Sequence, residues 1–350
     1  TLENYTSIQV RFFKKKRGIK MKKIVKILMF ILVMVSMIAC GKDGETSKKD
    51  EVVTWKLGHN ANKDHLWNKT ALKFSELVSE KSNGKMEIQV FDNGQLGSET
   101  DMINSVRMGT LDMVLTGETL QNWAPKAALM AVPYAFTSNE HMEKVLNGPL
   151  GEEIKENIEE KAGLMPLYYH MRAPRQLTTN KDIKSVDDLN GLVIRVPDVP
   201  VFVKAWQALG AKPTPMSLQE VFTSLQNNTI QAQENPYDLI NSLGFYEVQK
   251  YAYETEHVRQ WIYSVVGVKQ FNALSPELKN IVRESAQEAQ NYAQNEFLAY
   301  QKKVKDDLIS KGMIIRKMDQ ESMKNKIVPK LEEILTAEQF DLYKRIQEIK

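Results

Sequence analysis

The sequence has little of what catalysis or metal binding usually requires. Its 350 residues include one cysteine, Cys40, so no disulfide can form within the chain. It lacks G-x-x-x-x-G-K-[ST], G-x-G-x-x-G after a predicted strand, G-x-S-x-G and H-E-x-x-H, which mark phosphate loops, dinucleotide folds, serine hydrolases and zinc proteases. Its five histidines are scattered, and its 44 carboxylates single out no acid pair. The residues therefore predict a protein that is not an enzyme and that holds no cofactor and no metal.

The positive charge of the chain is confined to its N-terminal segment. The formal net charge of +3 includes +8 from residues 1–39, so the remaining chain carries −5. A folded part with a negative net charge repels a phosphate backbone, which excludes nucleic acid as the partner. With 42% apolar residues, the chain is long enough for two ordinary domains.

The first 51 residues have the pattern of a lipoprotein leader. We interpret residues 1–20 as an extension upstream of the true start, 21–39 as a signal peptide and 40–51 as a tether. The uncharged run from Ile27 to Ala39 is shorter than the roughly 20 residues that span a bilayer. Cys40 follows it directly and resembles the cysteine of a lipobox, although Met37 replaces the usual leucine. This predicts lipid attachment at Cys40 and an extracytoplasmic, membrane-held protein; a plain signal peptide is the alternative.

Strand-like and helix-like segments alternate along the rest of the chain, which predicts an α/β protein of two similar units. Predicted strands cover Val52–Leu57, Met86–Phe91, Leu111–Leu115, Leu164–Tyr169, Leu192–Val196 and Ile230–Glu234, and predicted helices cover Asp64–Lys81, Ser98–Met108, Val199–Leu209 and Ser217–Asn227. A longer helix starts at Ser275-Pro276-Glu277 and meets no Gly or Pro before Gly312. At 1.5 Å per residue it extends about 50 Å, so we expect it to cross both domains.

One arginine stands out in an apolar strand. Arg195 lies at the carboxyl end of Leu192–Val196, where α/β sheets bind their ligands. A guanidinium stays charged, and its burial without an anion is costly. Two interpretations are open from spacing alone: an internal ion pair with Asp198 or Glu234, or contact with a ligand carboxylate.

A set of short motifs follows in a fixed order. They are G-Q-L-G at Gly94–Gly97, G-T-L-D at Gly109–Asp112, R-V-P at Arg195–Pro197, the run from G-A-K-P-T-P-M to Q-A-Q-E-N-P at Gly210–Pro236, F-Y-E-V-Q-K-Y at Phe245–Tyr251 and T-x-H at Thr255–His257. Together they closely resemble the extracytoplasmic solute-binding subunits of TRAP transporters, the DctP-type family. The resemblance covers essentially the whole mature chain.

The resemblance implies a two-domain, clam-like periplasmic-binding-protein fold with a hinge. We expect lobe I to comprise residues 52–172 and 261–295, and lobe II residues 173–260 and 296–350. The implied protein is a monomer that captures a small organic acid, either a sugar acid or a dicarboxylate, and delivers it to TRAP membrane subunits for ion-gradient-driven import. The same module serving a membrane sensor kinase is the first alternative, and a secreted hydrolase is the second.

The resemblance also assigns the ligand's carboxylate to three side chains. Arg195 of R-V-P is the implied main clamp, Arg175 of Arg175-Gln176-Leu177-Thr178-Thr179 is the second arginine, and Asn235 of Q-E-N-P hydrogen-bonds the same end of the ligand. The planar fork of arginine suits a carboxylate, which agrees with this assignment.

Four further positions match places where sialic-acid binders of the family contact the sugar or carry related residues. Asn60 and Glu99 match contact positions, whereas Glu118, which follows Gly117, and Leu218, where those binders have an aromatic residue, depart from the pattern. These departures argue against sialic acid and leave the acid open among uronates, dicarboxylates and keto acids. Four aromatic residues either form walls of the site or belong to the core: Trp123, Tyr168, Tyr169 and Tyr237.

Overall fold

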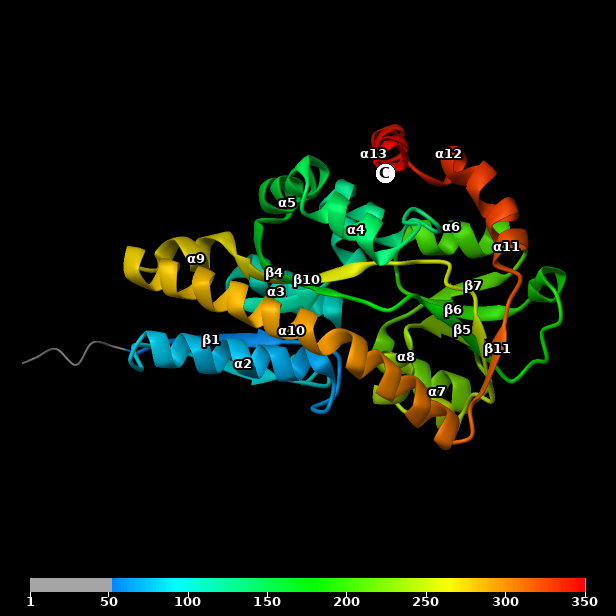
Figure 1. Cartoon of the computed structure of the whole chain (residues 1–350), viewed down its shortest axis with the longest axis horizontal. Coiled ribbons are helices and arrows are strands. Elements are labelled where there is room, and N and C mark those ends of the chain that lie inside the picture. The colour runs from blue at the N-terminus through cyan, green and yellow to red at the C-terminus, as the bar shows by residue number, and fades with distance from the viewer. Residues whose placement is uncertain (1–51, 350) are drawn as a thin grey trace, which may run out of the picture. The chain divides into compact units, whose positions relative to one another are not determined.

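A computed structural model describes residues 52–349, and its architecture rests on two β-sheets (Figure 1). The predicted signal, Cys40 and the tether lie outside these residues. Strands of the first sheet are β1 (Val53–Gly58), β2 (Met86–Phe91), β3 (Met113–Thr116), β4 (Leu164–Met171) and β10 (Trp261–Gly267). Strands of the second are β5 (Gln176–Thr179), β6 (Val193–Val196), β7 (Lys212–Pro215), β8 (Ala232–Asn235), β9 (Tyr251–Glu254) and β11 (Ile314–Lys317).

Helices pack around both sheets. The α-helices are α2 (Leu66–Lys81), α3 (Glu99–Met108), α4 (Asn139–Leu146), α5 (Pro149–Ala162), α6 (Pro200–Ala208), α7 (Val221–Gln226), α8 (Tyr237–Ser242), α9 (Val268–Ala273), α10 (Pro276–Ser310), α11 (Gln320–Ile327), α12 (Leu331–Ile334) and α13 (Ala337–Glu348). Short 3-10 helices are η1 (Glu118–Asn122), η2 (Pro125–Ala131), η3 (Val186–Leu189), η4 (Leu218–Glu220), η5 (Phe245–Glu247) and η6 (Val328–Lys330). Over residues 52–349, no helix combines the length and the apolar character needed to cross a membrane.

The order of the strands shows that the chain passes between the sheets more than once. The first sheet runs β2-β1-β3-β10-β4 and the second β11-β9-β5-β8-β6-β7. In the first sheet β1 pairs in parallel with β2 and β3, whereas β10 returns antiparallel to β3 and β4. The segments that connect the sheets lie side by side, because the Arg172 amide donates to Gln260 O at 3.0 Å and the Arg175 amide to Val258 O at 3.0 Å. The fold is therefore α/β with two domains joined by paired crossing segments.

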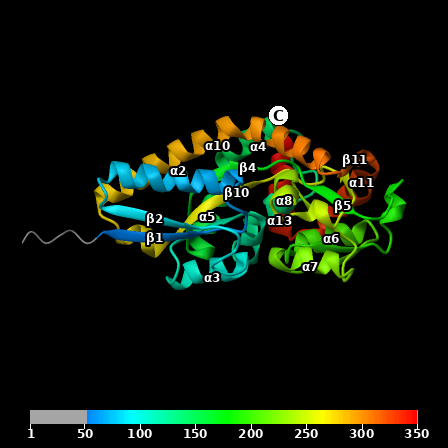
Figure 2. The ribbon, with the colours of Figure 1, turned by 90° about the horizontal axis from the view of Figure 1, so that it is seen from below.

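Helix α10 is the long helix expected from the sequence. Ser275 caps it by accepting from the Leu278 amide, and Pro276 occupies its first turn. Its 35 residues pack against α2 and β4 of the first domain and then reach α8 of the second, where Gln301 donates to Asp238 at 2.9 Å. Figures 1 and 2 show the helix passing from beside α2 toward the second sheet. The predicted crossing of both domains is confirmed.

Local boundaries differ from the prediction in one place that matters for the site. The sequence predicted one helix over Ser217–Asn227 with a capping box at Ser217 and Glu220, but the chain forms η4 and then α7, and the Ser217 side chain caps neither. The box predicted at Ser98 and Asp101 does form and begins α3. The 3-10 turn places Leu218 beside a cavity instead of inside a regular helix.

Candidate functional site

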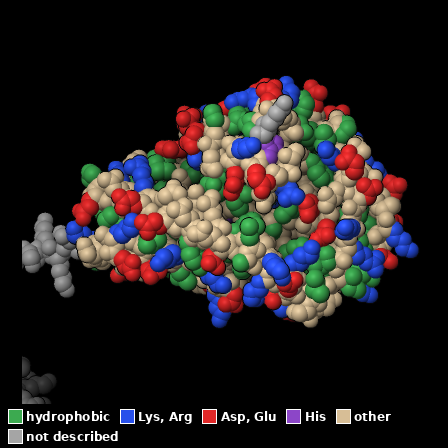
Figure 3. Space-filling view, in the orientation of Figure 1, with side chains coloured by type: hydrophobic (Ala, Val, Ile, Leu, Met, Phe, Trp, Pro, Cys, Tyr) green, Lys and Arg blue, Asp and Glu red, His purple; other side chains and the backbone are tan. Residues whose placement is uncertain are grey.

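A cavity of about 480 Å³ lies between elements of the two domains. All seven ligand-contact residues predicted from the sequence line it: Asn60, Glu99, Glu118, Arg175, Arg195, Leu218 and Asn235. Asn60, which follows β1, and residues from α2, α3, β3 and η1 form one wall, and residues from β6, β7, η4 and β8 form the opposite wall. On the outer surface, by contrast, basic and acidic side chains are interspersed over the face seen in Figure 3.

Arg195 is buried in this cavity without an anionic partner. It lies on β6 between β7 and β8, and its side chain is 4% exposed. Its Nε and Nη2 donate to one carbonyl oxygen, that of Met216, at 3.0 and 2.7 Å. Neither Asp198 nor Glu234 forms the internal ion pair that the sequence left open, and no carboxylate of residues 52–349 lies within 4.0 Å. Burial lowers the pKa of Arg195 to about 10, which keeps it charged at neutral pH.

Arg175 has the opposite surroundings, because its own chain supplies its anions. Its Nε and Nη2 both meet the Glu234 carboxylate, Nη2 at 2.7 Å, and its Nη1 donates to Glu118 at 3.0 Å. Nη2 also donates to Asn235 Oδ1 at 3.1 Å. Burial works to lower the pKa of Arg175, but the charges of Glu234 and Glu118 outweigh it and raise the pKa.

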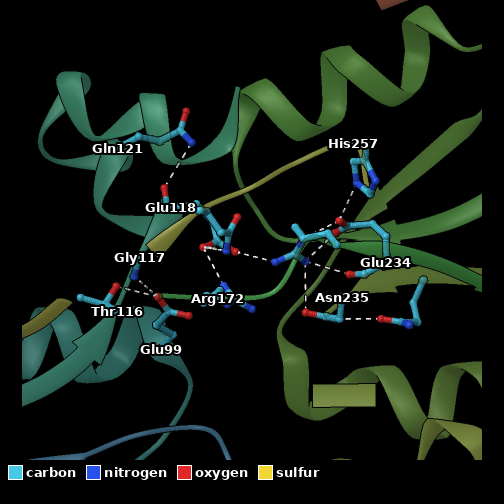
Figure 4. A network of polar contacts seen from close by, with 12 residues as sticks. Glu99, Thr116, Gly117, Glu118, Gln121, Arg172, Glu234, Asn235 and His257 are labelled. Atoms are coloured by element: carbon cyan, nitrogen blue, oxygen red, sulfur yellow. Dashed lines mark hydrogen bonds and ion pairs between the residues drawn. The ribbon is translucent and has the colours of Figure 1, made fainter. Parts of the chain in front are cut away.

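Glu234 is held by the same cluster (Figure 4). It is fully buried, and His257 Nε2 lies 3.0 Å from its Oε2. Burial opposes ionisation of Glu234, but the Arg175 charge and the hydrogen bonds of His257 and Arg175 lower its pKa to about 2. Thr255 Oγ1 lies 2.9 Å from His257 Nδ1, which fixes the imidazole from its other side. The T-x-H motif thus orients a partner of Glu234.

Sequence reasoning missed Arg172, a third arginine in the cavity. Its Nη1 donates to Glu118 Oε2 at 3.2 Å, and its guanidinium carbon lies 5.2 Å from the Trp67 ring centroid. Gln260 donates to the same Glu118 oxygen at 2.9 Å. Burial lowers the pKa of Arg172. The argument used for Arg195 could have found it, since Arg172 directly follows β4.

The wall across the cavity from Arg195 presents hydrogen-bond acceptors. Glu99, the first residue of α3, accepts from Thr116 Oγ1 at 2.6 Å and from the Gly117 amide at 3.4 Å. Burial and the nearby Glu118 charge raise the pKa of Glu99. Asn60 Oδ1 accepts from Gln219 Nε2 at 2.8 Å, and this bond joins the two walls.

None of the four aromatic residues considered from the sequence lines the cavity. Tyr168 packs on Phe74 with ring centroids 5.4 Å apart, and the Tyr169 hydroxyl accepts from Gln294. Trp123 stacks under Arg107, and the Tyr237 hydroxyl donates to Glu254; these four residues belong to the packing of the domains. Trp67 forms the aromatic wall instead. In the part of the chain that the structure describes, no cluster of three or more His, Cys, Asp or Glu could hold a metal ion.

Known proteins are similar to this chain in sequence and in architecture. The family described as "Bacterial extracellular solute-binding protein, family 7" (DctP) matches residues 57–338. The solute-binding protein RD1_1052 of Roseobacter denitrificans is 48% identical over 267 residues, which cover 76% of this chain and 82% of the relative. The 2,3-diketo-L-gulonate-binding periplasmic protein YiaO of Escherichia coli is 31% identical over 84% of this chain and 91% of its own.

The solved structures include the Roseobacter denitrificans protein, a TRAP periplasmic solute-binding protein with bound L-galactonate. It aligns with a TM-score of 0.83 at 44% identity and covers 85% of this chain and 99% of its own.

Proposed function

The chain belongs to family 7 of the bacterial extracellular solute-binding proteins, and we propose that it is the receptor that captures a small organic acid for a TRAP transporter. The receptor binds the acid by its carboxylate outside the cytoplasm and passes it to the TRAP membrane subunits. It carries the acid without converting it.

The observation that supports this function is the unpaired charge of Arg195. The guanidinium of Arg195 is 4% exposed and bonds to one carbonyl oxygen, so it is largely buried and has no anion of its own chain. Such burial is costly unless a bound anion compensates it. A ligand carboxylate supplies the missing charge, and its two oxygens match the arginine fork.

The ligand we propose is a sugar acid. The polar groups Asn60, Glu99, Ser98, Thr119 and Ser217 line the cavity around the arginines and suit a hydroxylated chain. The bound L-galactonate of the Roseobacter protein and the name of the Escherichia coli relative support the same class. An apolar acid would leave these groups without partners.

Isothermal titration with hexonates and hexuronates tests the function. We expect Arg195→Ala to weaken the binding of the acid that the parent binds by about 100-fold, since truncating a buried ion-pair partner costs on the order of 2–5 kcal/mol. Arg195→Lys should also bind distinctly worse, because it keeps the charge and loses the fork. Arg283→Ala, an exposed arginine on α10, is the control. Parent-like binding by both Arg195 variants would contradict the proposal.

We also propose that the two lobes move as units around the cavity. Lobe I comprises residues 52–172 and 261–295, and lobe II comprises residues 173–260 and 296–350 except for α13, which packs on lobe I. Helix α13 supports this last point, because Gln339 donates to Pro125 O at 3.0 Å and Arg345 pairs with Glu153 at 2.7 Å. Elements of both lobes line the cavity, so closure around a ligand would bury it.

Lipid attachment at Cys40 is the proposed anchor of this extracytoplasmic receptor. The lipobox-like sequence at residues 37–41 and the polar tether that follows support it. If Cys40 carries the lipid, Cys40→Ser moves the mature protein from the membrane fraction to the soluble fraction. Membrane retention of the variant with an unchanged N-terminus would count against the anchor.

A further inference from the structure

The cavity contains charges that the chain neutralises itself and charges that it does not. Arg172 and Arg175 share Glu118, and Arg175 also pairs with Glu234. Three charged side chains of the lining are left without an ion pair: Arg195, on β6, Glu99, at the start of α3 on the opposite wall, and Asp198, which is exposed to solvent. No ion pair within 4.0 Å involves any of them among residues 52–349.

Glu99 is oriented by neutral donors only. The Thr116 hydroxyl and the Gly117 amide both donate to Oε1, and Figure 4 shows the carboxylate beside these groups, on the side of the site away from Glu234 and Asn235. Its place in the first turn of α3 also favours a negative charge. Its wall therefore presents an acceptor, and the arginine whose charge acts on Glu99, Arg172, already donates to Glu118.

The second acid on this wall differs in one respect. Glu118 receives bonds from Arg172, Arg175 and Gln260, so its charge is compensated before a ligand enters. Glu99 has no ion pair within 4.0 Å among residues 52–349, and Arg172 acts on its charge only from a longer distance.

We propose that Glu99 sets the charge selectivity of the site: the receptor takes sugar acids with one carboxylate and rejects those with a carboxylate at both ends. The inference rests on the proposed function, since it takes the first carboxylate to lie at Arg195. A terminal hydroxyl of the ligand donates to Glu99, and a hydrogen bond to a charged acceptor is stronger than a neutral one. A terminal carboxylate in the same place offers no donor and adds a like charge in a water-poor cavity.

Acidification should weaken the selectivity. Burial raises the pKa of Glu99 most and the charge of Glu118 raises it further, whereas the hydroxyls of Thr116 and Thr119 and the charge of Arg172 lower it. A protonated Glu99 no longer repels a second carboxylate and can donate to it. As the pH falls, the affinity for a diacid should therefore rise relative to that for the matching monoacid, whose terminal hydroxyl then donates to a neutral acceptor.

Matched ligands provide the test. Galactonate and galactarate have the same carbon chain and differ at C6, which carries a hydroxyl in the first and a carboxylate in the second; gulonate and glucarate form a second pair, and galactitol lacks both carboxylates. Titration calorimetry at pH 8 should show at least tenfold weaker binding of each diacid than of the better-bound monoacid, and no binding of galactitol. Glu99→Gln should reduce that ratio to about threefold or less and remove its pH dependence. Glu87→Gln, an exposed change on β2, should leave the ratio as in the parent.

The outcomes separate this inference from the function on which it rests. Equal binding of monoacid and diacid by the parent, or an unchanged ratio in Glu99→Gln, overturns the role of Glu99 while the carboxylate receptor stands. Binding of galactitol as tight as that of galactonate, or no binding of any sugar acid, overturns the proposed function itself. A Glu99→Gln protein with a parent-like melting temperature shows that a changed ratio does not come from misfolding.

Discussion

Arg175 and Arg195 lie in the same cavity and are almost equally buried, at 1% and 4% exposure, but their surroundings differ. Arg175 meets two carboxylates of its own chain and an amide oxygen. Arg195 meets one carbonyl oxygen, that of Met216. The two arginines therefore have different roles, which their sequence motifs do not distinguish. Arg175 belongs to an ion-pair network that is complete without a ligand, whereas the charge of Arg195 is left for a ligand to compensate.

The largest expected difference between Arg175 and Arg195 is in stability, when each guanidinium is removed in the absence of ligand. Arg175→Met leaves Glu234 buried without its cation, so the free energy of unfolding should fall by about 3–5 kcal/mol. Arg195→Met removes a buried charge that has no anion, and the unfolding free energy should stay the same or rise. Urea unfolding at pH 7 measures both. Similar losses in the two variants would show that the pairing around Arg175 does not distinguish it from Arg195.

A second test concerns a buried polar side chain that lacks a partner but, unlike Arg195, does not line the cavity. His170, on β4, is 2% exposed, and neither ring nitrogen has a hydrogen-bond partner in residues 52–349. Burial lowers its pKa to about 3, with smaller effects of His65 and His59 in the same direction and an opposing one of Asp238. The cavity does not include it, so we expect His170 to affect stability and not ligand binding.

The sign of this effect follows from proton binding. Between pH 6.5 and 3 the unfolded chain protonates His170 and the folded chain does not, so stability falls as the pH falls through that window. The slope approaches about 1.4 kcal/mol per pH unit below pH 6.5, so the loss from pH 6.5 to 4.5 is about 2 kcal/mol. In His170→Phe, the slope of the unfolding free energy against pH should be smaller by the contribution of one proton. Urea unfolding at several pH values measures this slope. His59, whose pKa burial lowers to about 4, contributes to the pH dependence of stability in both parent and variant. Parallel curves for parent and variant would contradict this account.

The smallest expected effect concerns the bond that joins the two walls. Gln219→Ala removes the 2.8 Å bond to Asn60, which should weaken sugar-acid binding by about fivefold, or about 1 kcal/mol. Spin labels at Lys85→Cys and Lys212→Cys, in a Cys40→Ser background, should approach each other when galactonate is added, and less so in Gln219→Ala. An unchanged label distance at saturating ligand would show that Arg195 sits in a rigid, preformed pocket.

Much of the site was predictable because short motifs place its residues. All seven predicted contact residues line one cavity, although they lie between residues 60 and 235. The neighbours of each residue were not predictable. Glu234 was considered as a partner of Arg195, but β5 and β8 pair so that Leu177 faces Glu234 and Gln176 faces Asn235. That register places Glu234 next to Arg175.

Local sequence by itself determined the alternation of strands and helices, the capped start of α10 and the location of the positive charge, because these depend on residues within a few positions of one another. Only the tertiary structure decided which arginine is neutralised, that Arg172 joins the site and that Glu99 lines the cavity without an ion pair. Each of these outcomes depends on strand register and on which side chains meet across two domains. Ion pairing acts over a few ångströms between residues far apart in the chain, so folding has to bring the charges together before their partners are defined.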